Sequence, residues 1–92
     1  PMGRFMLLAP HAGALGALFS RAAARGLGFR ALVATGSESD LSLGEIGEAA
    51  ANEPDVDAFM LFVDTIEHPA ALIRFAAKAH AAGKPIVAYR RA

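Results

Sequence analysis

Short unbroken apolar runs alternate along this sequence with longer segments in which apolar residues recur at helical spacing. The runs are Phe5–Leu8, Ala31–Ala34, Phe59–Val63 and Pro85–Tyr89. Runs in which apolar residues do not alternate with polar ones are typical of strands covered on both faces, as in a parallel sheet. The sequence therefore predicts four buried strands.

The segments between these runs predict three amphipathic helices. Apolar residues spaced at i, i+3, i+4 and i+7 lie on one face of a helix. Three sets have this spacing: Leu15, Leu18, Phe19 and Ala22; Leu43, Ile46, Gly47 and Ala50; and Leu72, Phe75, Ala76 and Ala79. We expect each set to be the buried face of its helix.

The residues that flank the helical segments support the same boundaries. Gly26 and Gly83 stand just past the first and third helices, where a left-handed residue commonly ends a helix. Ser42 with Glu45 three residues later forms a capping box at the start of the second helix. His68 is the expected N-cap of the third helix.

The resulting order is β-α-β-α-β-α-β. Right-handed crossovers place each helix on a face of the sheet that depends on the direction in which the strand order runs. Because both faces of the strands are apolar, we expect the order to reverse, as in the flavodoxin-like arrangement 2-1-3-4. The predicted fold is α/β: a flavodoxin-like three-layer sandwich with a parallel sheet of four strands and three helices.

Length and charge exclude several classes of protein. A chain of 92 residues holds one core, so residues 1–92 are expected to form a single domain. Nine basic and nine acidic residues leave no net charge to attract nucleic acid or an anionic membrane surface. The absence of cysteine excludes disulfides and thiolate metal sites and favours the cytoplasm.

The N-terminal apolar segment predicts neither a membrane span nor a secretion signal. Residues 5–20 carry no charge, but this stretch is shorter than the roughly 20 residues that cross a bilayer. Pro10 and His11 interrupt its apolar part, and the pattern continues as an amphipathic helix. The abrupt end after the last apolar run, at Arg90–Ala92, indicates a fragment of a longer protein with an incomplete sheet.

Ligands of open parallel sheets bind at the carboxyl ends of the strands, where the strand order reverses. Here those ends are the loops Ala9–Gly13, Thr35–Asp40 and Asp64–His68. The first loop leads directly into a helix, whose free N–H groups and dipole favour an anion. The candidate phosphate- or anion-binding residues are His11, Ala12, Gly13, Ala14, Gly36 and Ser37.

Simpler interpretations of these residues remain open. Gly13 and Gly16 match neither a P-loop nor the dinucleotide fingerprint, and close packing of the helix on the sheet would explain both glycines equally well. Ser37 suits a turn. No pair of histidines has metal-ligand spacing, so we predict no metal site.

In order and spacing, the segments of this chain resemble one family. They are His11–Gly16 (HAGALG), Ala22–Phe29 (AAARGLGF), Val33–Leu41 (VATGSESDL), Glu53–Val56, Phe59–Ile66 and Gly83–Ala88. The resemblance is to the succinyl-CoA synthetase-like CoA-ligase domain, a flavodoxin-like domain of NDP-forming acyl-CoA synthetases, and it covers nearly the whole chain.

The resemblance implies a role in a three-stage reaction. Acyl-CoA and phosphate give an acyl phosphate, a histidine takes the phosphoryl group, and ADP or GDP receives it. In such enzymes the helix that begins here near Gly13 points at the phosphohistidine. The resemblance also implies CoA, ATP or GTP and Mg as cofactors of the parent protein, none of them bound by this fragment. It further implies ATP-grasp and CoA-binding domains, in cis or in a partner subunit.

Three departures from the family pattern bear on activity. Pro10-His11-Ala12-Gly13 replaces a Ser-Gln-Ser-Gly turn, so two hydroxyls and one N–H are missing. Asp64 stands where the family has the catalytic glutamate that orients the reactive histidine. The Ser-His-Thr-Gly-like segment that carries this histidine lies beyond the fourth strand and is not reached, so the fragment alone is expected to be inactive.

Alternative interpretations accompany the enzyme hypothesis. The chain could be a noncatalytic anion-binding or subunit-contact module, which the lost hydroxyls favour. A receiver domain is disfavoured because Pro10 and His11 occupy the place of its acidic pair. His11 could be a ligand or a surface residue, and Asp64 with Glu67 an acid–base pair or an unrelated strand end and helix start. An unpaired edge at the fourth strand favours a homo-oligomer.

Overall fold

The computed structural model describes residues 4–26, 28–34, 43–63 and 69–90. It contains four strands and three helices in strict alternation within these ranges. They are β1 (Arg4–Ala9), α1 (Ala12–Ala24), β2 (Gly28–Ala34), α2 (Leu43–Ala50), β3 (Ala58–Val63), α3 (Pro69–Ala81) and β4 (Ile86–Arg90). The predicted α/β fold is confirmed, and β2 begins three residues earlier than its apolar run.

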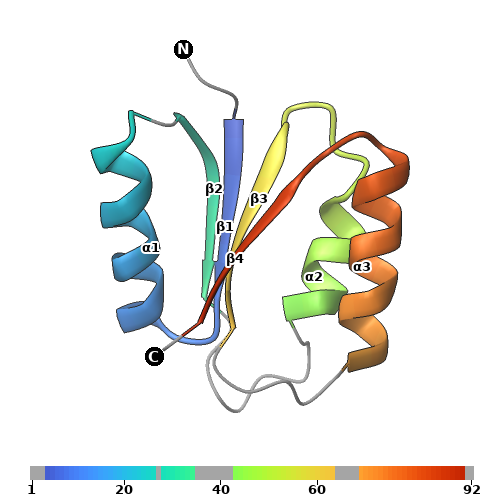
Figure 1. The fold of residues 1–92 in the computed structure, drawn as a ribbon, viewed down its shortest axis with the longest axis horizontal. Helices are drawn as coiled ribbons and strands as arrows, with labels where there is room; N and C mark the ends of the chain where they lie inside the picture. The colour runs from blue at the N-terminus through green and yellow to red at the C-terminus, as the bar shows by residue number, and fades with distance from the viewer. Residues whose placement is uncertain (1–3, 27, 35–42, 64–68, 91–92) are drawn as a thin grey trace.

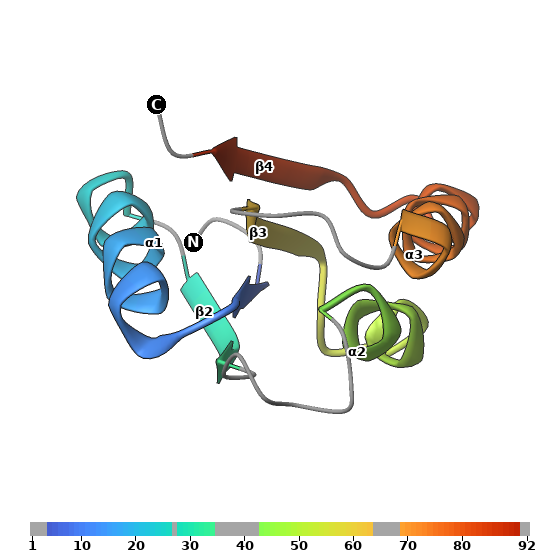
Figure 2. The same cartoon turned by 90° about the horizontal axis from the view of Figure 1, so that it is seen from below.

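The strands form a parallel sheet in the order β2-β1-β3-β4. Helix α1 lies on one side of this sheet, and α2 and α3 lie together on the other side (Figure 1). The view in Figure 2 shows the three layers end on, with β2 and β4 at opposite edges. Strand β1 therefore has a neighbour on each side, and the chain reverses its direction of travel across the sheet at β1.

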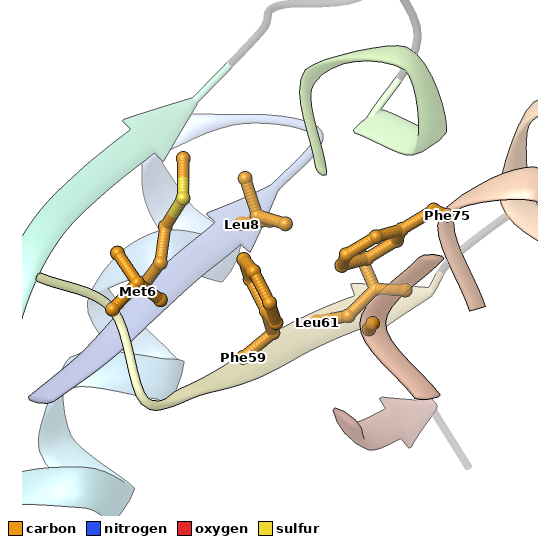
Figure 3. Packing of buried hydrophobic residues seen from close by; sticks show 7 residues of the cluster. Met6, Leu8, Phe59, Leu61 and Phe75 are labelled. Atoms are coloured by element: carbon orange, nitrogen blue, oxygen red, sulfur yellow. The ribbon is translucent and has the colours of Figure 1, made fainter. Parts of the chain in front are cut away.

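Alternate residues of the central strands supply two separate cores. Met6 and Leu8 of β1 face α2 and α3, where they pack with Phe59, Leu61 and Phe75 (Figure 3). On the opposite face a second cluster packs against α1, and it consists of Leu7, Ala9, Ala14, Leu18, Ala22 and Met60. This two-sided burial is the reason why the strands read as unbroken apolar runs.

The buried face of α1 differs from the predicted one. Ala14, Leu18 and Ala22, spaced four residues apart, are buried, whereas Phe19 is 43% exposed and Leu15 is only partly buried. Alanine at two of the three central positions lets the helix axis lie close to the sheet. The larger side chains of Leu15 and Phe19 then lie beside the row of buried residues rather than within it.

Helix α3 shows the same difference. Its buried residues are Ala71, Phe75 and Ala79, and Leu72 packs against the core at its margin. Ala76 was expected in the buried face, but it is exposed. The residues of α3 that are buried against its neighbours are therefore spaced four apart, and they form a narrower stripe than the i, i+3, i+4 pattern predicts.

Helix α2 packs on α3 through two glycines. The predicted face of α2 is confirmed, because Gly47 is buried and Leu43, Ile46 and Ala50 pack against the core. Gly44, outside that face, is also buried. A Cβ at Gly44 would lie 2.6 Å from the carbonyl carbon of Ala71, so the two helix backbones approach as closely as glycine allows.

Both predicted helix-terminating glycines are confirmed. Gly26 has φ 71° and Gly83 has φ 74°, the left-handed conformation that glycine adopts without strain. After α3, the N–H of Lys84 donates to the carbonyl of Ala79 at 2.8 Å and the N–H of Gly83 donates to that of His80 at 3.0 Å. Ser42 and His68 lie outside the described residues, and their capping roles stay predictions.

Among the residues that the structure describes, two exposed ion-pair groups join elements distant in sequence. Asp57 accepts from the N–H of Arg4 at 2.8 Å and from its guanidinium at 3.2 Å, and the guanidinium bond is the main cause that lowers the pKa of Asp57. Glu48 of α2 lies 3.0 Å from Arg74 and 3.5 Å from Lys78 of α3, and the hydrogen bond from Arg74 is the main cause that lowers its pKa. In the described ranges no helix is long and apolar enough to cross a membrane.

Candidate anion-binding site

The candidate site begins where β1 leaves the sheet. The last residue of β1, Ala9, is fully buried and pairs with Ala34 at the end of β2. On the other side Leu8 of β1 pairs with Leu61 of β3. The chain therefore emerges between two neighbouring strands, passes through Pro10 and His11, and enters α1 at the carboxyl edge of the sheet.

His11 is the N-cap of α1. Its backbone is extended, with φ −156° and ψ 166°, and its side-chain Nδ1 accepts a hydrogen bond from the N–H of Ala14 at 3.1 Å. Its carbonyl accepts from the N–H of Leu15 at 3.0 Å. An acceptor at Nδ1 places the proton of the neutral ring on Nε2. Sequence reasoning missed this role because the usual N-cap residues are Ser, Thr, Asp and Asn.

The cap decides which amides remain for an anion. The N–H of Ala14 already donates to His11, and that of Leu15 to the first helical turn. The N–H groups of Ala12 and Gly13 have no acceptor among the described residues. Both residues are exposed, and the first turn of α1 carries no acidic side chain. Two adjacent donors at the positive end of a helix thus face solvent.

Close packing does not explain the glycines of this helix. A Cβ at Gly16 would meet nothing within 4 Å, and Gly16 is exposed. A Cβ at Gly13 would stand 3.4 Å from Nδ1 of His11, an ordinary contact with an exposed ring. The interpretation of these glycines as helix-on-sheet contacts is therefore wrong, because neither one faces the sheet.

The remaining predicted site residues lie outside the described part of the chain. Gly36 and Ser37 follow β2, and Asp64 and Glu67 follow β3. The structure brings together His11, Ala12, Gly13 and Ala14 but gives no position for these four. Within the described ranges no group of three His, Cys, Asp or Glu side chains could hold a metal ion.

Two replacements of His11 test whether its side chain stabilises the domain as the N-cap of α1. His11→Ala removes the acceptor for the Ala14 N–H and should lower the free energy of unfolding by about 0.5–2 kcal/mol. His11→Asn keeps a side-chain acceptor of a preferred N-cap type and should cost little. Urea unfolding of the two variants measures the difference. Equal losses in both would contradict the capping role.

The fold and this strand-to-helix turn define an α/β domain of the flavodoxin-like class. The family described as "Succinyl-CoA ligase like flavodoxin domain" matches residues 3–92. The chain belongs to this family.

One named relative is similar over most of this chain. A trans-feruloyl-CoA synthase, FCS1, from an unknown prokaryotic organism is 36% identical over 81 residues, which make up 87% of this chain and 12% of that protein. The chain thus spans a small part of the relative that it matches.

Two solved structures share the fold. One is the apo form of a dinucleotide forming acetyl-coenzyme A synthetase 1 from Ca. Korarchaeum cryptofilum, with a TM-score of 0.77 and 16% identity over 97% of this chain and 20% of that one. The other is PH0766 from Pyrococcus horikoshii OT3, with the same TM-score and identity over 99% of this chain and 21% of that one. At this identity the likeness concerns the fold alone.

Proposed function

We propose that residues 1–92 are a single CoA-ligase domain within an NDP-forming acyl-CoA synthetase, an acid–thiol ligase. Its task there is to dock a phosphohistidine or an acyl phosphate at the start of α1. Membership of the succinyl-CoA ligase-like family and 36% identity to a named feruloyl-CoA synthase support the acyl-CoA ligase class. On this proposal the domain is inactive by itself.

The observation that carries the docking role is the pair of donors at Ala12 and Gly13 that have no acceptor among the described residues. A phosphoryl group in transfer carries negative charge, and helix N-termini stabilise such charge through N–H groups and the helix dipole. Because the first turn of α1 has no acidic residue, no carboxylate there offsets the positive electrostatic potential of the helix N-terminus. No lysine or arginine is required, which agrees with a chain of zero net charge.

Other parts of the proposal rest on the sequence pattern and on the resemblance. Gly36 and Ser37 would add amide and hydroxyl donors from the loop after β2. Asp64 would orient the reactive histidine, in the place where the family has a longer glutamate. CoA, ATP or GTP and Mg would be held by CoA-binding and ATP-grasp domains, in cis or in a partner subunit. We further propose that the parent protein is a cytoplasmic oligomer.

A noncatalytic module that binds an anion or contacts a subunit is the second candidate function. Pro10 and Ala12 favour it, because the first has no N–H and neither carries the hydroxyl expected at this turn. Phosphohistidine formation separates the two functions. The enzyme hypothesis requires it in a polypeptide that contains this chain together with an ATP-grasp portion, whereas the module hypothesis excludes it.

Phosphate is expected to raise the melting temperature of this chain. A ligand that binds only the folded state stabilises it by RT ln(1 + [L]/Kd), about 1.4 kcal/mol at ten times Kd. Gly13→Asp should abolish the shift, because its carboxylate occupies the positive helix end and repels the anion. Thermal melts in phosphate and in chloride at equal ionic strength measure the effect.

Gly16→Asp is the matched control for this experiment. Gly16 is also an exposed glycine of α1, one turn farther along, with open space around its Cβ position. The Gly16 variant should keep the phosphate shift. No shift at high phosphate in the unaltered chain, or loss of the shift in both variants, would overturn the anion site.

A further inference from the structure

Among the described elements, α1 packs against β1, β2 and β3, and β4 is the strand least covered on this side of the sheet. The buried residues of α1 pack on Leu7 and Ala9 of β1 and on Met60 of β3. Strand β4 lies at the edge of the sheet opposite β2 (Figure 2), and its Tyr89 packs only at the margin of this cluster. Apolar side chains on this part of the sheet are therefore incompletely covered.

The exposed part of this face is apolar and belongs to β3 and β4. Phe62 and Tyr89 are directly opposite each other in the register, and both are only half-buried. Val87, two residues before Tyr89 and thus on the same face, is 40% exposed. Neighbouring apolar side chains that are incompletely covered are typical of an interaction surface, unlike isolated ones.

Two arginines at the C-terminal end of α1 border this face: Arg21 in its last turn and Arg25, its C-cap. The guanidinium carbon of Arg21 lies 4.8 Å from the centroid of the Tyr89 ring, and an Nη atom of Arg25 donates to the Tyr89 hydroxyl at 2.7 Å. Tyr89 thus holds both positive groups beside the apolar strip. We define the Tyr89 surface as Phe62, Val87, Tyr89, Arg21 and Arg25.

The positive charge of the Tyr89 surface has no acidic counterpart in the described part of the chain. Neither arginine forms an ion pair with a carboxylate of the described residues, and α1 contains no acidic residue at all. Both guanidinium groups contact the same Tyr89 side chain, and like charges held so close together are unfavourable. Their positions become favourable when a negatively charged group approaches both.

We propose that the Tyr89 surface binds a protein segment that forms a helix with an apolar face bordered by carboxylates. The apolar face would cover Phe62 and Val87, and the carboxylates would meet Arg21 and Arg25. A second copy of this chain fits poorly, because the Tyr89 surface contains no carboxylate and a twofold contact through it would give the arginines no negative partner. The inference is independent of the anion site at the start of α1.

A pair of designed peptides tests this proposal. Both form an amphipathic helix with the same leucine face, which is flanked by glutamates in one peptide and by lysines in the other. Titration of the isotope-labelled chain followed by NMR should shift the Val87 methyl and Tyr89 ring signals with the glutamate peptide. The lysine peptide should bind at least about tenfold more weakly. The double variant Arg21→Glu, Arg25→Glu should reverse this preference.

Val87→Thr and Ile73→Thr form a matched control pair. Both replace an exposed β-branched residue by another β-branched residue, but Ile73, 69% exposed, lies on α3 on the opposite side of the sheet. Only the Val87 variant should weaken binding of the glutamate peptide. Absence of binding, equal binding of the two peptides, the same shifts with inorganic phosphate alone, or the same shifts on self-association without peptide would each overturn the proposal.

Discussion

Gly44→Ala is expected to destabilise this domain by about 1–3 kcal/mol, the usual cost of overpacking a well-packed contact. The added methyl group would lie 2.6 Å from both the carbonyl carbon of Ala71 and the nitrogen of Leu72. These are backbone atoms of α3, so no side-chain rotation can relieve the clash and the two helices must separate. Each kcal/mol should lower the melting temperature by about 4–8 °C in a domain of this size.

The control for this prediction is the same substitution at an open position. Gly16→Ala adds a methyl group that meets nothing within 4 Å on the exposed side of α1. Alanine is the better helix former, so this variant should gain about 0.5–1 kcal/mol. Thermal melts of the two variants should therefore shift in opposite directions. Shifts of the same sign would contradict the tight α2–α3 contact.

The contrast between Gly44 and Gly16 shows what the sequence alone could not supply. Periodicity predicted that α2 has a buried face, because its apolar residues recur at helical spacing. Gly44 lies outside that spacing and contributes nothing to the signal. Its importance here comes from Ala71 and Leu72, which are far along the chain and become neighbours only through the packing of α3. The class of fold can be predicted from the spacing of nearby residues. The close contacts cannot, because they join residues that are far apart in the sequence.

The helix faces show the same limit on a smaller scale. The sequence placed Phe19 in the core because large aromatic residues at helical spacing are usually buried. In the structure Ala14 occupies the contact line instead, and Phe19 is 43% exposed. Which of two adjacent stripes faces the sheet depends on how closely the helix axis can approach. Small residues such as Ala14 determine how closely the helix can approach the sheet. A prediction based on hydropathy gives such residues little weight.

The location of the candidate site was predictable, but its donors were not. The reversal of strand order at β1 follows from the pattern of apolar runs, and it places the start of α1 at the carboxyl edge. That Ala14 is unavailable to an anion follows from the side-chain orientation of His11, which no spacing rule gives. The expected set of amides thus narrows to Ala12 and Gly13 among the described residues.

Zero net charge conceals a separation of charge over the surface. The carboxylates of Asp57 and Glu48 are paired with basic residues at the start of β1 and on α3. Arg21 and Arg25, in contrast, contact the Tyr89 side chain and pair with no carboxylate of the described residues. A net charge of zero therefore argues against a general attraction for polyanions. It is compatible with a local positive patch that binds a partner with carboxylates.

Phe75→Ala is expected to lower the free energy of unfolding by about 3–5 kcal/mol, the cost of truncating a large ring in a core. The ring is fully buried and packs edge-on against Phe59, with centroids 4.8 Å apart at 90°. It also fills the space beside Gly47 of α2. Its removal opens a cavity between the sheet and both helices, against a total stability of typically about 5–15 kcal/mol. Urea unfolding measures the loss.

Two further variants test the physical reason for this loss. Phe19→Ala removes the same ring from a side chain that is 43% exposed, and it should cost about half as much or less. Gly47→Ala places a methyl group 2.6 Å from the Phe75 ring and should destabilise the unaltered chain. In the Phe75→Ala background that clash is absent, so the same substitution should become neutral or stabilising. Additive losses from the two substitutions would contradict direct packing of Phe75 on Gly47.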